Sequence, residues 1–262
     1  WNSDVSVFIV NDASTEKISI LDLIIKNIKL IKVINMKKNR GHARCNAAGL
    51  KFLSENENFD YVIVMDGDGE DRPEELSSIF EKSKQNSTKT ITANRIQRSE
   101  GPFFKLLYEC HKILTNIFTG KSIKFGNYIC LPKNDVIKLV KEPSIWSSFS
   151  GSVTKIISDR ASIHSIRGNR YFGPSKMNFF DLMLHSLSIM AVFKGIVIIR
   201  SLTFLIFYIY FIFNDFSIIT SFPVIIVLIF LFLIIKISAR ENIIELNNSL
   251  QNIDSLDSLN SR

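Results

Sequence analysis

The stretch from Tyr61 to Glu75 joins a buried strand to a helix through an acidic loop. Residues 61–65 are apolar and include β-branched valine and isoleucine, which favours a buried strand. The strand stops at Asp66-Gly67-Asp68-Gly69-Glu70-Asp71, and Pro73 with two following glutamates is typical of a helix N-terminus. The loop therefore lies at the carboxyl end of a strand, which is where open α/β sheets bind their ligands.

Asp66 and Asp68 are candidate metal ligands, because they are two residues apart across a glycine. Two carboxylates placed in this way can share one divalent cation and leave its other positions to water and phosphate oxygens. The alternative is an acidic turn that faces solvent and binds nothing. The strand before the loop and the helix start after it favour the site for a metal and a phosphate.

The first two thirds of the chain alternate between strand and helix patterns. Strands are expected over 5–10, 31–36, 61–65, 88–93 and 128–131, and helices over 18–30, 42–56, 73–85, 103–118 and 134–140. In the helix over 42–56, the residues expected to face the core are Ala43, Ala47, Leu50 and Leu53. This succession predicts a three-layer α/β sheet. Residues 141–176 fit neither pattern well.

Charge and cysteine usage narrow the class of protein. The net charge is +7, with much of the basic excess between Lys82 and Lys176, which suits a phosphate-rich substrate or an anionic membrane surface. No basic module with interleaved aromatic residues is present, so we expect no nucleic-acid partner. The 3 cysteines, Cys45, Cys110 and Cys130, are far apart and indicate core thiols in a reducing compartment.

The last third contains two stretches that can cross a membrane. The stretch 216–235 has no charged residue and reaches the roughly 20 apolar residues that a spanning helix needs. The stretch 196–213 qualifies if Arg200 extends to the headgroups. The link Asn214-Asp215 has no basic residue, whereas Lys194, Arg200, Lys236 and Arg240 flank the other ends. The positive-inside rule then predicts that both termini are cytoplasmic.

An amphipathic helix is expected over 178–194, before the first of these stretches. Its apolar face would carry Phe179, Phe180, Met183, Leu184, Leu187, Met190 and Ala191. Asp181, His185 and Ser188 would lie largely opposite. Such a helix lies at a membrane interface or covers a protein core. The polar tail from Glu241 is expected to be a frayed helix or disordered.

Four motifs, in order along the chain, carry a resemblance to a known family. The loop Val10-Asn11-Asp12-Ala13-Ser14-Thr15 is similar to a Val-Asp-Asp-Gly-Ser-Thr loop, and Asn39-Arg40-Gly41 through Gly49 is similar to an Asn-x-Gly turn and helix. Asp66 through Glu74 is similar to an Asp-x-Asp loop, and Arg167 through Lys176 is similar to an Arg…Gly-x-Ser-Lys segment. The chain thus resembles family 2 glycosyltransferases, most closely the membrane-associated branch of dolichol-phosphate mannosyltransferases and bacterial polyprenyl-phosphate glycosyltransferases.

The resemblance implies a GT-A fold, which is the three-layer α/β sheet of nucleotide-diphospho-sugar transferases. It also implies a nucleotide-sugar donor and a divalent cation, Mg²⁺ or Mn²⁺. We expect this domain over residues 1–176, without the first strand and helix of the family. An interface helix over 177–194, a two-helix transmembrane hairpin over 195–236 and a polar cytoplasmic tail over 237–262 would follow. A homo-oligomer is compatible with this reading.

The motifs and the basic residues give a set of candidate site residues. Asp68, Glu70 and Arg170 are the candidate catalytic residues, and Glu70 can orient a metal-bound water or the acceptor, or alternatively be a solvated side chain. Asn11 stands where the family has its first Asp, so it can accept a hydrogen bond from a base but carries no charge. The candidate substrate-binding residues are Asn11, Asp12, Asn39, Gly41, Asp66, Arg95, Arg167, Arg170, Ser175 and Lys176.

The sequence after Trp146 lacks the acidic residue that could act as a general base for a hydroxyl acceptor. A sugar hydroxyl needs a general base, which many family members supply as an Asp near a Trp, but Trp146 is followed by Ser147-Ser148-Phe149-Ser150-Gly151. A phosphate acceptor needs no base, because its second pKa of about 6 leaves it anionic at neutral pH. Arg167, Arg170 and Lys176 can bind such phosphates, or alternatively grip anionic lipid. We therefore expect a polyprenyl-phosphate acceptor.

Three other functions stay open. The chain can be a glycosyltransferase that acts on another membrane-proximal acceptor, or a membrane-anchored module that binds a nucleotide sugar without catalysis. It can also be a nucleotidyltransferase, which shares the handling of metal and phosphate. That class normally carries a Gly-rich loop with Lys or Arg after its first strand.

Overall fold

The structure is a computed structural model that describes residues 4–15, 28–97, 102–173 and 179–260. Its first sheet has the order β1-β2-β7, from β1 (Ser6–Asn11), β2 (Leu30–Met36) and β7 (Ile253–Asn260). β1 and β2 are parallel, and β7 is antiparallel to β2. α1 (His42–Asn56) packs against β1. The helix expected over 18–30 lies largely outside the described residues.

The second sheet has the order β3-β5-β4-β6. Its strands are β3 (Tyr61–Val64), β4 (Thr90–Gln97), β5 (Phe125–Pro132) and β6 (Arg160–Ile166). β5 is antiparallel to both of its neighbours, and β4 is parallel to β6. The helical elements around this sheet are η1 (Pro73–Glu75), α2 (Leu76–Gln85), α4 (Lys133–Leu139), η2 (Pro143–Trp146) and α5 (Phe149–Ile156).

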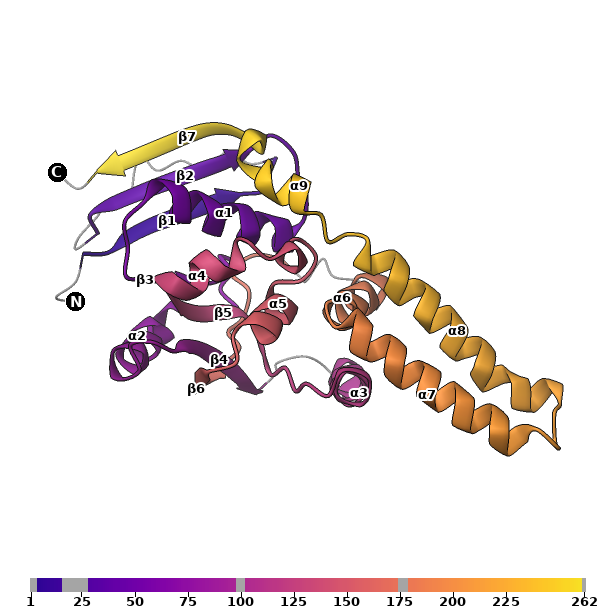
Figure 1. Cartoon of the computed structure of the whole chain (residues 1–262). Helices are drawn as coiled ribbons and strands as arrows, with labels where there is room; N and C mark the ends of the chain where they lie inside the picture. Colours follow the sequence, from indigo (N-terminus) through magenta and orange to yellow (C-terminus); the bar gives the residue numbers. More distant parts are fainter. Residues whose placement is uncertain (1–3, 16–27, 98–101, 174–178, 261–262) are drawn as a thin grey trace.

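Alternate residues of β5 enter the two cores that lie on the two faces of this sheet. Tyr128 and Cys130 pack with α2, whereas Ile129 and Leu131 pack with α1, α4 and α5. This follows from the two-residue period of a strand. The predicted three-layer arrangement of helices around a mixed sheet is therefore present in this part of the chain (Figure 1).

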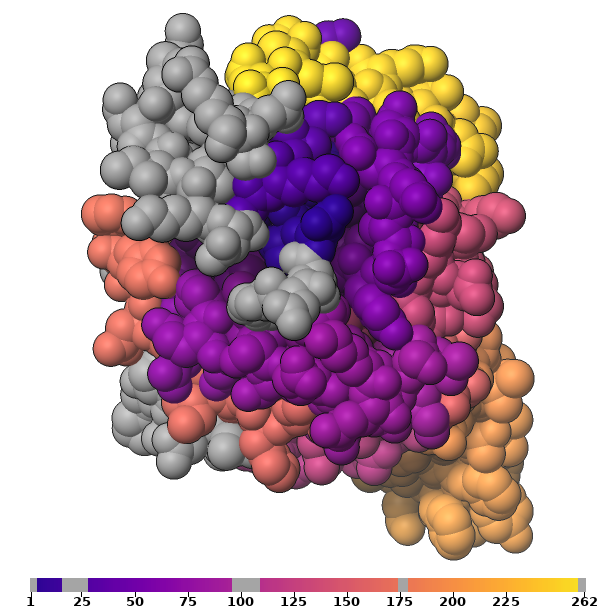
Figure 2. Space-filling model, turned by 90° about the vertical axis from the view of Figure 1, so that its left-hand side faces the viewer, coloured from indigo at the N-terminus to yellow at the C-terminus, as the bar shows by residue number. Residues whose placement is uncertain are grey.

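The expected single sheet is divided into two. β1 and β3 are each the end strand of their own sheet, and no described strand lies between them. α1 connects the two halves, since Ala48 and Phe52 pack with the first sheet, while Ala47 and Leu50 join the core of the second. Figure 2 shows the side of the molecule where the indigo segment that contains β1 is open at the surface.

Two long helices project from this domain as a hairpin (Figure 1). α7 (Lys194–Ile212) and α8 (Ile218–Ser238) are long and apolar enough to cross a membrane. Most of their side chains face outward, including Ile199, Ile206 and Phe211 of α7. A core helix of a water-soluble domain would bury such residues, because each large apolar side chain gains roughly 1.5–3 kcal/mol on burial.

Arg200 of α7 is hydrogen-bonded to α3. Its guanidinium donates to the carbonyl groups of Asn116 and Ile117, at 3.3 and 2.6 Å, and its extension to lipid headgroups stays a prediction. These carbonyls belong to the last turn of α3 (Pro102–Thr119), and that of Asn116 also accepts from the N–H of Gly120 at 2.8 Å. A cation is also favourable at this end of the helix dipole. Arg200 therefore fastens α3 to the base of the hairpin.

The amphipathic helix is present as α6 (Phe179–Ala191), but its two faces differ from the prediction. The large side chains of its first two turns, Phe179, Phe180, Met183 and Leu184, are exposed. Ser188 is buried, although we expected it on the solvent face. The reason is that α6 packs with α3, α5 and α8, so its polar side faces protein.

The prediction that the tail from Glu241 is frayed or disordered is wrong. α9 (Ile243–Asn247), η3 (Ser249–Asn252) and β7 return the chain to the first sheet. Leu246 is fully buried in the core that contains Trp146. Asn35 of β2 donates to Ser255 and Asp257 of β7, at 3.1 and 2.9 Å. The polar composition suggested disorder, but these polar residues pair with polar groups on β2.

Candidate functional site

The acidic loop after β3 is folded by its own carboxylates. The backbone N–H of Asp66 donates to Asp71 Oδ2 at 3.0 Å, and the N–H of Glu70 donates to Asp68 Oδ1 at 3.0 Å. Gly69, which lies between Asp68 and Glu70, has a φ of 92°, a left-handed conformation that favours glycine. The side chains of Asp66 and Asp68 stay half-buried, so both carboxylates remain accessible.

Two residues that the sequence did not single out, Asp71 and Asn127, form hydrogen bonds that hold this loop. Asp71 is buried, 3% exposed, and its Oδ1 lies 3.3 Å from the guanidinium of Arg95. Burial raises the pKa of Asp71, although the Arg95 charge opposes that shift. Asn127 Nδ2 on β5 donates to Asp66 Oδ1 at 2.9 Å. Asp71 was visible as part of an acidic cluster, whereas a single Asn within a strand gives no sequence signal.

A segment after β6, residues 167–173, lies directly on the acidic loop. The N–H of Gly168 donates to the carbonyl of Glu70, and the N–H of Tyr171 donates to the carbonyl of Asp68, both at 2.9 Å. A Cβ added to Gly168 would come within 2.3 Å of the Gly69 carbonyl oxygen. A Cβ added to Gly69 would come within 2.9 Å of the Tyr171 ring, so glycine at both positions lets the two segments approach.

The charges of the two segments are paired. Arg170 lies 2.7 Å from Asp68 Oδ2 and 3.2 Å from Glu70 Oε1, and Arg167 also pairs with Glu70. Burial alone would raise the pKa of Glu70, but hydrogen bonds and charge from the two arginines lower it. The three candidate catalytic residues therefore lie in one ion-pair cluster. Ser175 and Lys176 are outside the described residues.

A second set of predicted residues meets at the end of β1. The carboxylate of Asp12 accepts from the N–H groups of Arg40 and Gly41, at 3.0 and 2.8 Å. Asn39 Oδ1 also accepts from Gly41, at 3.2 Å. Gly41 has a φ of 89° and precedes α1. Asp12, Asn39 and Gly41 thus lie together, with Asp12 holding the turn, and their contact with a substrate stays a prediction.

Both the nitrogen and the oxygen of the Asn11 side-chain amide form hydrogen bonds within the protein. Its Nδ2 donates to Asn35 Oδ1 at 2.9 Å, and its Oδ1 accepts from the N–H of Ser14 at 3.0 Å. The structure therefore gives Asn11 a role in shaping the loop after β1. Contact with a nucleobase stays a prediction for this residue.

The loops that follow β1 and β3 both bring a carboxylate close enough to Cys45 of α1 to act on its charge. Burial raises the pKa of the Cys45 thiol on α1 to about 12, and the negative charges of Asp12 and Asp66 add to the shift. The Cys45 thiol is thus affected by the charge of Asp12 from one loop and of Asp66 from the other. Arg95 contacts the acidic loop through Asp71, and within the described residues it makes no hydrogen bond to Asp66 or Asp68.

The residues present fit a divalent cation that is shared with a substrate. Within the described residues, no three His, Cys, Asp or Glu side chains gather as a complete metal site. Asp66 and Asp68 offer carboxylate oxygens, and Asn127 orients one of them. Mg²⁺ is commonly held by one or two carboxylates together with water and substrate phosphates, so this donor set suits it.

The comparison with protein families gives one clear match. A family model described as "Glycosyl transferase family 2" matches residues 1–142, which is 142 of the 262 residues. This range contains β1 to β5, the acidic loop and the turn before α1. No curated protein matches the chain.

Proposed function

Because the chain belongs to glycosyltransferase family 2, we propose that it transfers a sugar from a nucleotide sugar to a polyprenyl phosphate at a membrane surface. Membership of the family implies glycosyltransferase activity, a nucleotide-sugar donor and an acceptor. The choice of lipid phosphate, the membrane and the residue roles below are our proposal. The observation that carries it is the cluster of Asp68, Glu70, Arg167 and Arg170, whose two arginines precede α6 and the apolar helices α7 and α8 in the chain.

The donor binds where the two loops meet. Asp66 and Asp68 would hold Mg²⁺ or Mn²⁺, which would supply a Lewis acid for the departure of the nucleoside diphosphate. Asp12, Asn39 and Gly41 set the shape of the nucleotide-binding turn. A donor diphosphate brings negative charge to this site, so Arg170 can exchange its bond with Asp68 for a bond with a phosphate oxygen.

We take the acceptor to be a phosphate, because among the described residues no acid near Trp146 is free to act as a base for a hydroxyl. Trp146 is buried, 2% exposed, which leaves its ring no room to stack on an acceptor sugar. One acid does reach it: Glu245 of α9 accepts from Trp146 Nε1 at 2.8 Å. The same carboxylate oxygen lies 3.4 Å from Arg40. Glu245 therefore holds α9 against the domain and is not free to act as a base. A phosphate acceptor needs no base, because it is already anionic at neutral pH.

The hairpin of α7 and α8 anchors the domain in the membrane. Both ends of the hairpin lead back to the same domain, through α6 on one side and through α9 and β7 on the other. The basic residues at these ends favour the cytoplasmic side. The exposed apolar residues of α6 and α3, such as Phe180, Met183 and Ile117, continue the apolar surface of the hairpin toward the site.

Mass spectrometry of lipids tests this function directly. Membranes that carry the full chain are incubated with a panel of nucleotide sugars, and membranes with Asp68→Asn serve as the matched control. We expect polyprenyl phosphate to gain the mass of one sugar only with the unaltered chain. A sugar on another acceptor, a nucleotidyl group on the product, or no turnover with any donor would each contradict the proposal.

A further inference from the structure

The tail that follows the hairpin, residues 241–260, lies against the loops that carry the predicted nucleotide-binding residues. It consists of α9, η3 and β7, and Figure 1 shows β7 (yellow) beside β2. The match to the glycosyltransferase family covers residues 1–142, so it ends before this tail. Two sets of hydrogen bonds join the tail to those loops.

The first set is a row of polar side chains that crosses the first sheet at the carboxyl end of β1. Asn11 of β1 lies opposite Asn35 of β2, and Asn35 lies opposite Ser255 of β7. Asn35 Nδ2 donates to Ser255 Oγ at 3.1 Å and to Asp257 Oδ2 at 2.9 Å. Asn35 Oδ1 accepts from Asn11 Nδ2 at 2.9 Å, and Asn11 Oδ1 accepts from the N–H of Ser14 at 3.0 Å. Two amide side chains thus connect the tail to the loop after β1.

The chemistry of this row fixes which way each amide faces. An ionised carboxylate can only accept hydrogen bonds, so Asp257 requires the nitrogen of Asn35 on its side. The oxygen of Asn35 then faces β1 and requires the nitrogen of Asn11. The oxygen of Asn11 is left on the side of the loop, where it accepts from Ser14. A carboxylate of the tail therefore decides which atom Asn11 presents to the loop after β1.

The second set holds the segment that leads into the turn before α1. The N–H of Lys37 donates to the carbonyl of Asn252 at 2.7 Å, and Asn252 Nδ2 donates to the carbonyl of Lys38 at 3.2 Å. Lys37 Nζ also donates to the carbonyl of Gln251 at 3.0 Å. Lys37 and Lys38 directly precede the turn 39–41, so η3 positions the start of that turn.

We propose that the tail is part of the donor site, with Asp257 and Asn252 as positioning residues for the nucleotide. Resting on the function proposed above, Asp257 orients the amide of Asn11 through Asn35, and Asn252 positions the turn 39–41. Both residues act through other residues of this chain. Because the tail follows α8, the nucleotide side of the site is complete only when the hairpin has returned the chain to the domain.

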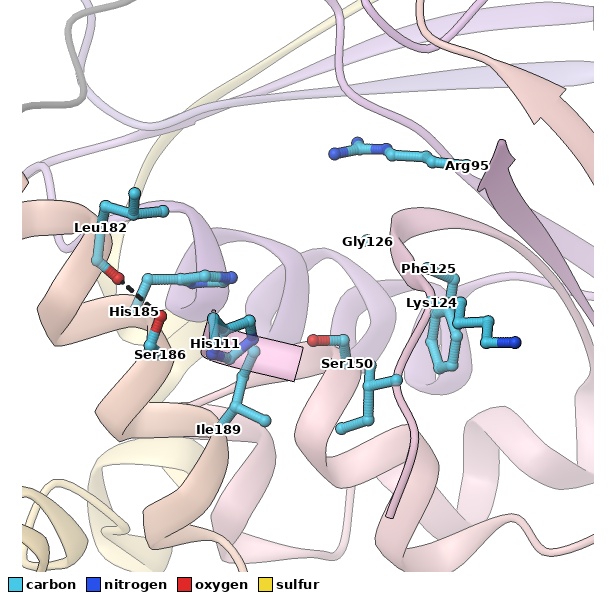
Figure 3. A pocket seen from close by; sticks show the side chains of 11 residues that line it. Arg95, His111, Lys124, Phe125, Gly126, Ser150, Leu182, His185, Ser186 and Ile189 are labelled. Atoms are coloured by element: carbon cyan, nitrogen blue, oxygen red, sulfur yellow. Dashed lines mark hydrogen bonds between the residues drawn. The ribbon is translucent and has the colours of Figure 1, made fainter. Parts of the chain in front are cut away.

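The cavity drawn in Figure 3 is separate from these hydrogen bonds. Its lining residues, which include Arg95, His111 and His185, belong to the second sheet, to the segment before β5 and to α3, α5 and α6. None of the lining residues comes from the first sheet or from the tail. A change at Asp257 or Asn252 should therefore affect the nucleotide side of the site without altering this cavity.

Nucleotide binding to the full chain in detergent tests this role without the acceptor. The Kd of each nucleoside diphosphate of the common RNA bases is measured in the presence of Mg²⁺. Asp257→Lys offers only donors to Asn35, and it should raise the Kd of the tightest nucleotide about three- to tenfold, the range for one lost hydrogen bond. Asp257→Asn keeps an acceptor oxygen and should bind like the unaltered chain. Asp254→Lys makes the same charge change at an exposed residue of β7 and should not alter Kd.

Amide hydrogen exchange gives a second readout that needs no ligand. In Asp257→Lys we expect faster exchange at the N–H of Ser14, because the amide that accepts from it loses its fixed orientation. In Asn252→Ala we expect faster exchange at the N–H of Gly41, and the Kd should again rise about three- to tenfold. Gln251→Ala is the matched control, because the Gln251 side chain donates to Asn248 within the tail. It should change neither property.

The outcomes separate the role of the tail from the proposed function. Nucleotide binding with an unchanged Kd in both Asp257→Lys and Asn252→Ala would refute the positioning role alone. Equal effects of Asp257→Lys and Asp254→Lys would also refute it, because charge and not the accepted hydrogen bond would then be the cause. Faster exchange in the two variants with no nucleotide bound by any chain would refute the proposed function and leave the hold of the tail on the two loops standing.

Discussion

The guanidinium of Arg170 lies 2.7 Å from the carboxylate of Asp68. These residues are far apart in the sequence, and they meet because the segment 167–173 lies on the acidic loop through two backbone hydrogen bonds. The contact places the charged group of Arg170, a candidate phosphate-binding residue, on Asp68, a candidate metal ligand of the acidic loop. If Asp68 holds the metal as proposed, donor binding would rearrange this pair, which makes Arg170 an informative side chain to replace.

Arg170→Ala should reduce kcat/KM by about ten- to a hundredfold, which corresponds to a loss of roughly 1.5–3 kcal/mol for a charge-assisted contact. The rate is measured in detergent at subsaturating polyprenyl phosphate. Lys89→Ala is the matched control, because Lys89 pairs with the exposed Asp159 at 2.8 Å on the surface. That pair should matter little. Unchanged kinetics in Arg170→Ala would show that this arginine does not contact the substrates.

Gly168→Ala should lift the segment 167–173 from the acidic loop, since the added Cβ would meet the Gly69 carbonyl at 2.3 Å. We expect hydrogen exchange at the N–H groups of Gly168 and Tyr171 to become faster, together with a loss of activity. Gly195→Ala, where a Cβ meets nothing within 4 Å, is the control and should keep both properties. Protected amides in Gly168→Ala would contradict the close backbone contact.

The returning tail should contribute to stability through Leu246. This side chain is fully buried beside Trp146, so Leu246→Ala should cost about 2–5 kcal/mol and lower Tm in detergent. Its neighbour Ile244 is 69% exposed, and Ile244→Ala should leave Tm nearly unchanged. Equal Tm values for the two variants would mean that α9 does not dock on the domain.

The pairing of β7 with β2 also constrains topology. The segments before α7 and after α8 meet in one domain, so they must lie on the same side of any membrane that the hairpin crosses. Tags placed at residues 4 and 260 should both be digested by protease only after the cytoplasmic side is opened. Digestion of one tag alone from the outside would contradict the hairpin.

Local patterns predicted much of the fold. The helix over 42–56 has the predicted bounds, and three of its four predicted core residues, Ala47, Leu50 and Leu53, are buried. The acidic loop also lies where the strand and the Pro73 helix start placed it. These features depend on periodicity and turn chemistry within a few residues, which a sequence displays directly.

Features that depend on distant contacts were not predictable. β7 forms because its polar residues meet Asn35, more than 200 positions earlier, and no local pattern signals that partner. The partners of Arg167 and Arg170 were equally hidden, because the basic run alone is compatible with lipid, substrate or protein carboxylates. Asn127 is one polar residue in an apolar strand, and only the neighbouring Asp66 explains it.

Release of nucleoside diphosphate in proteoliposomes tests the central claim most directly. The full chain is supplied with a nucleotide sugar and Mg²⁺, and with either polyprenyl phosphate or the corresponding polyprenol. We expect release that depends on the phosphate and falls by about a hundredfold or more in Asp68→Asn, because stabilisation of the leaving group is lost. Equal release with the polyprenol, or full release in Asp68→Asn, would contradict it.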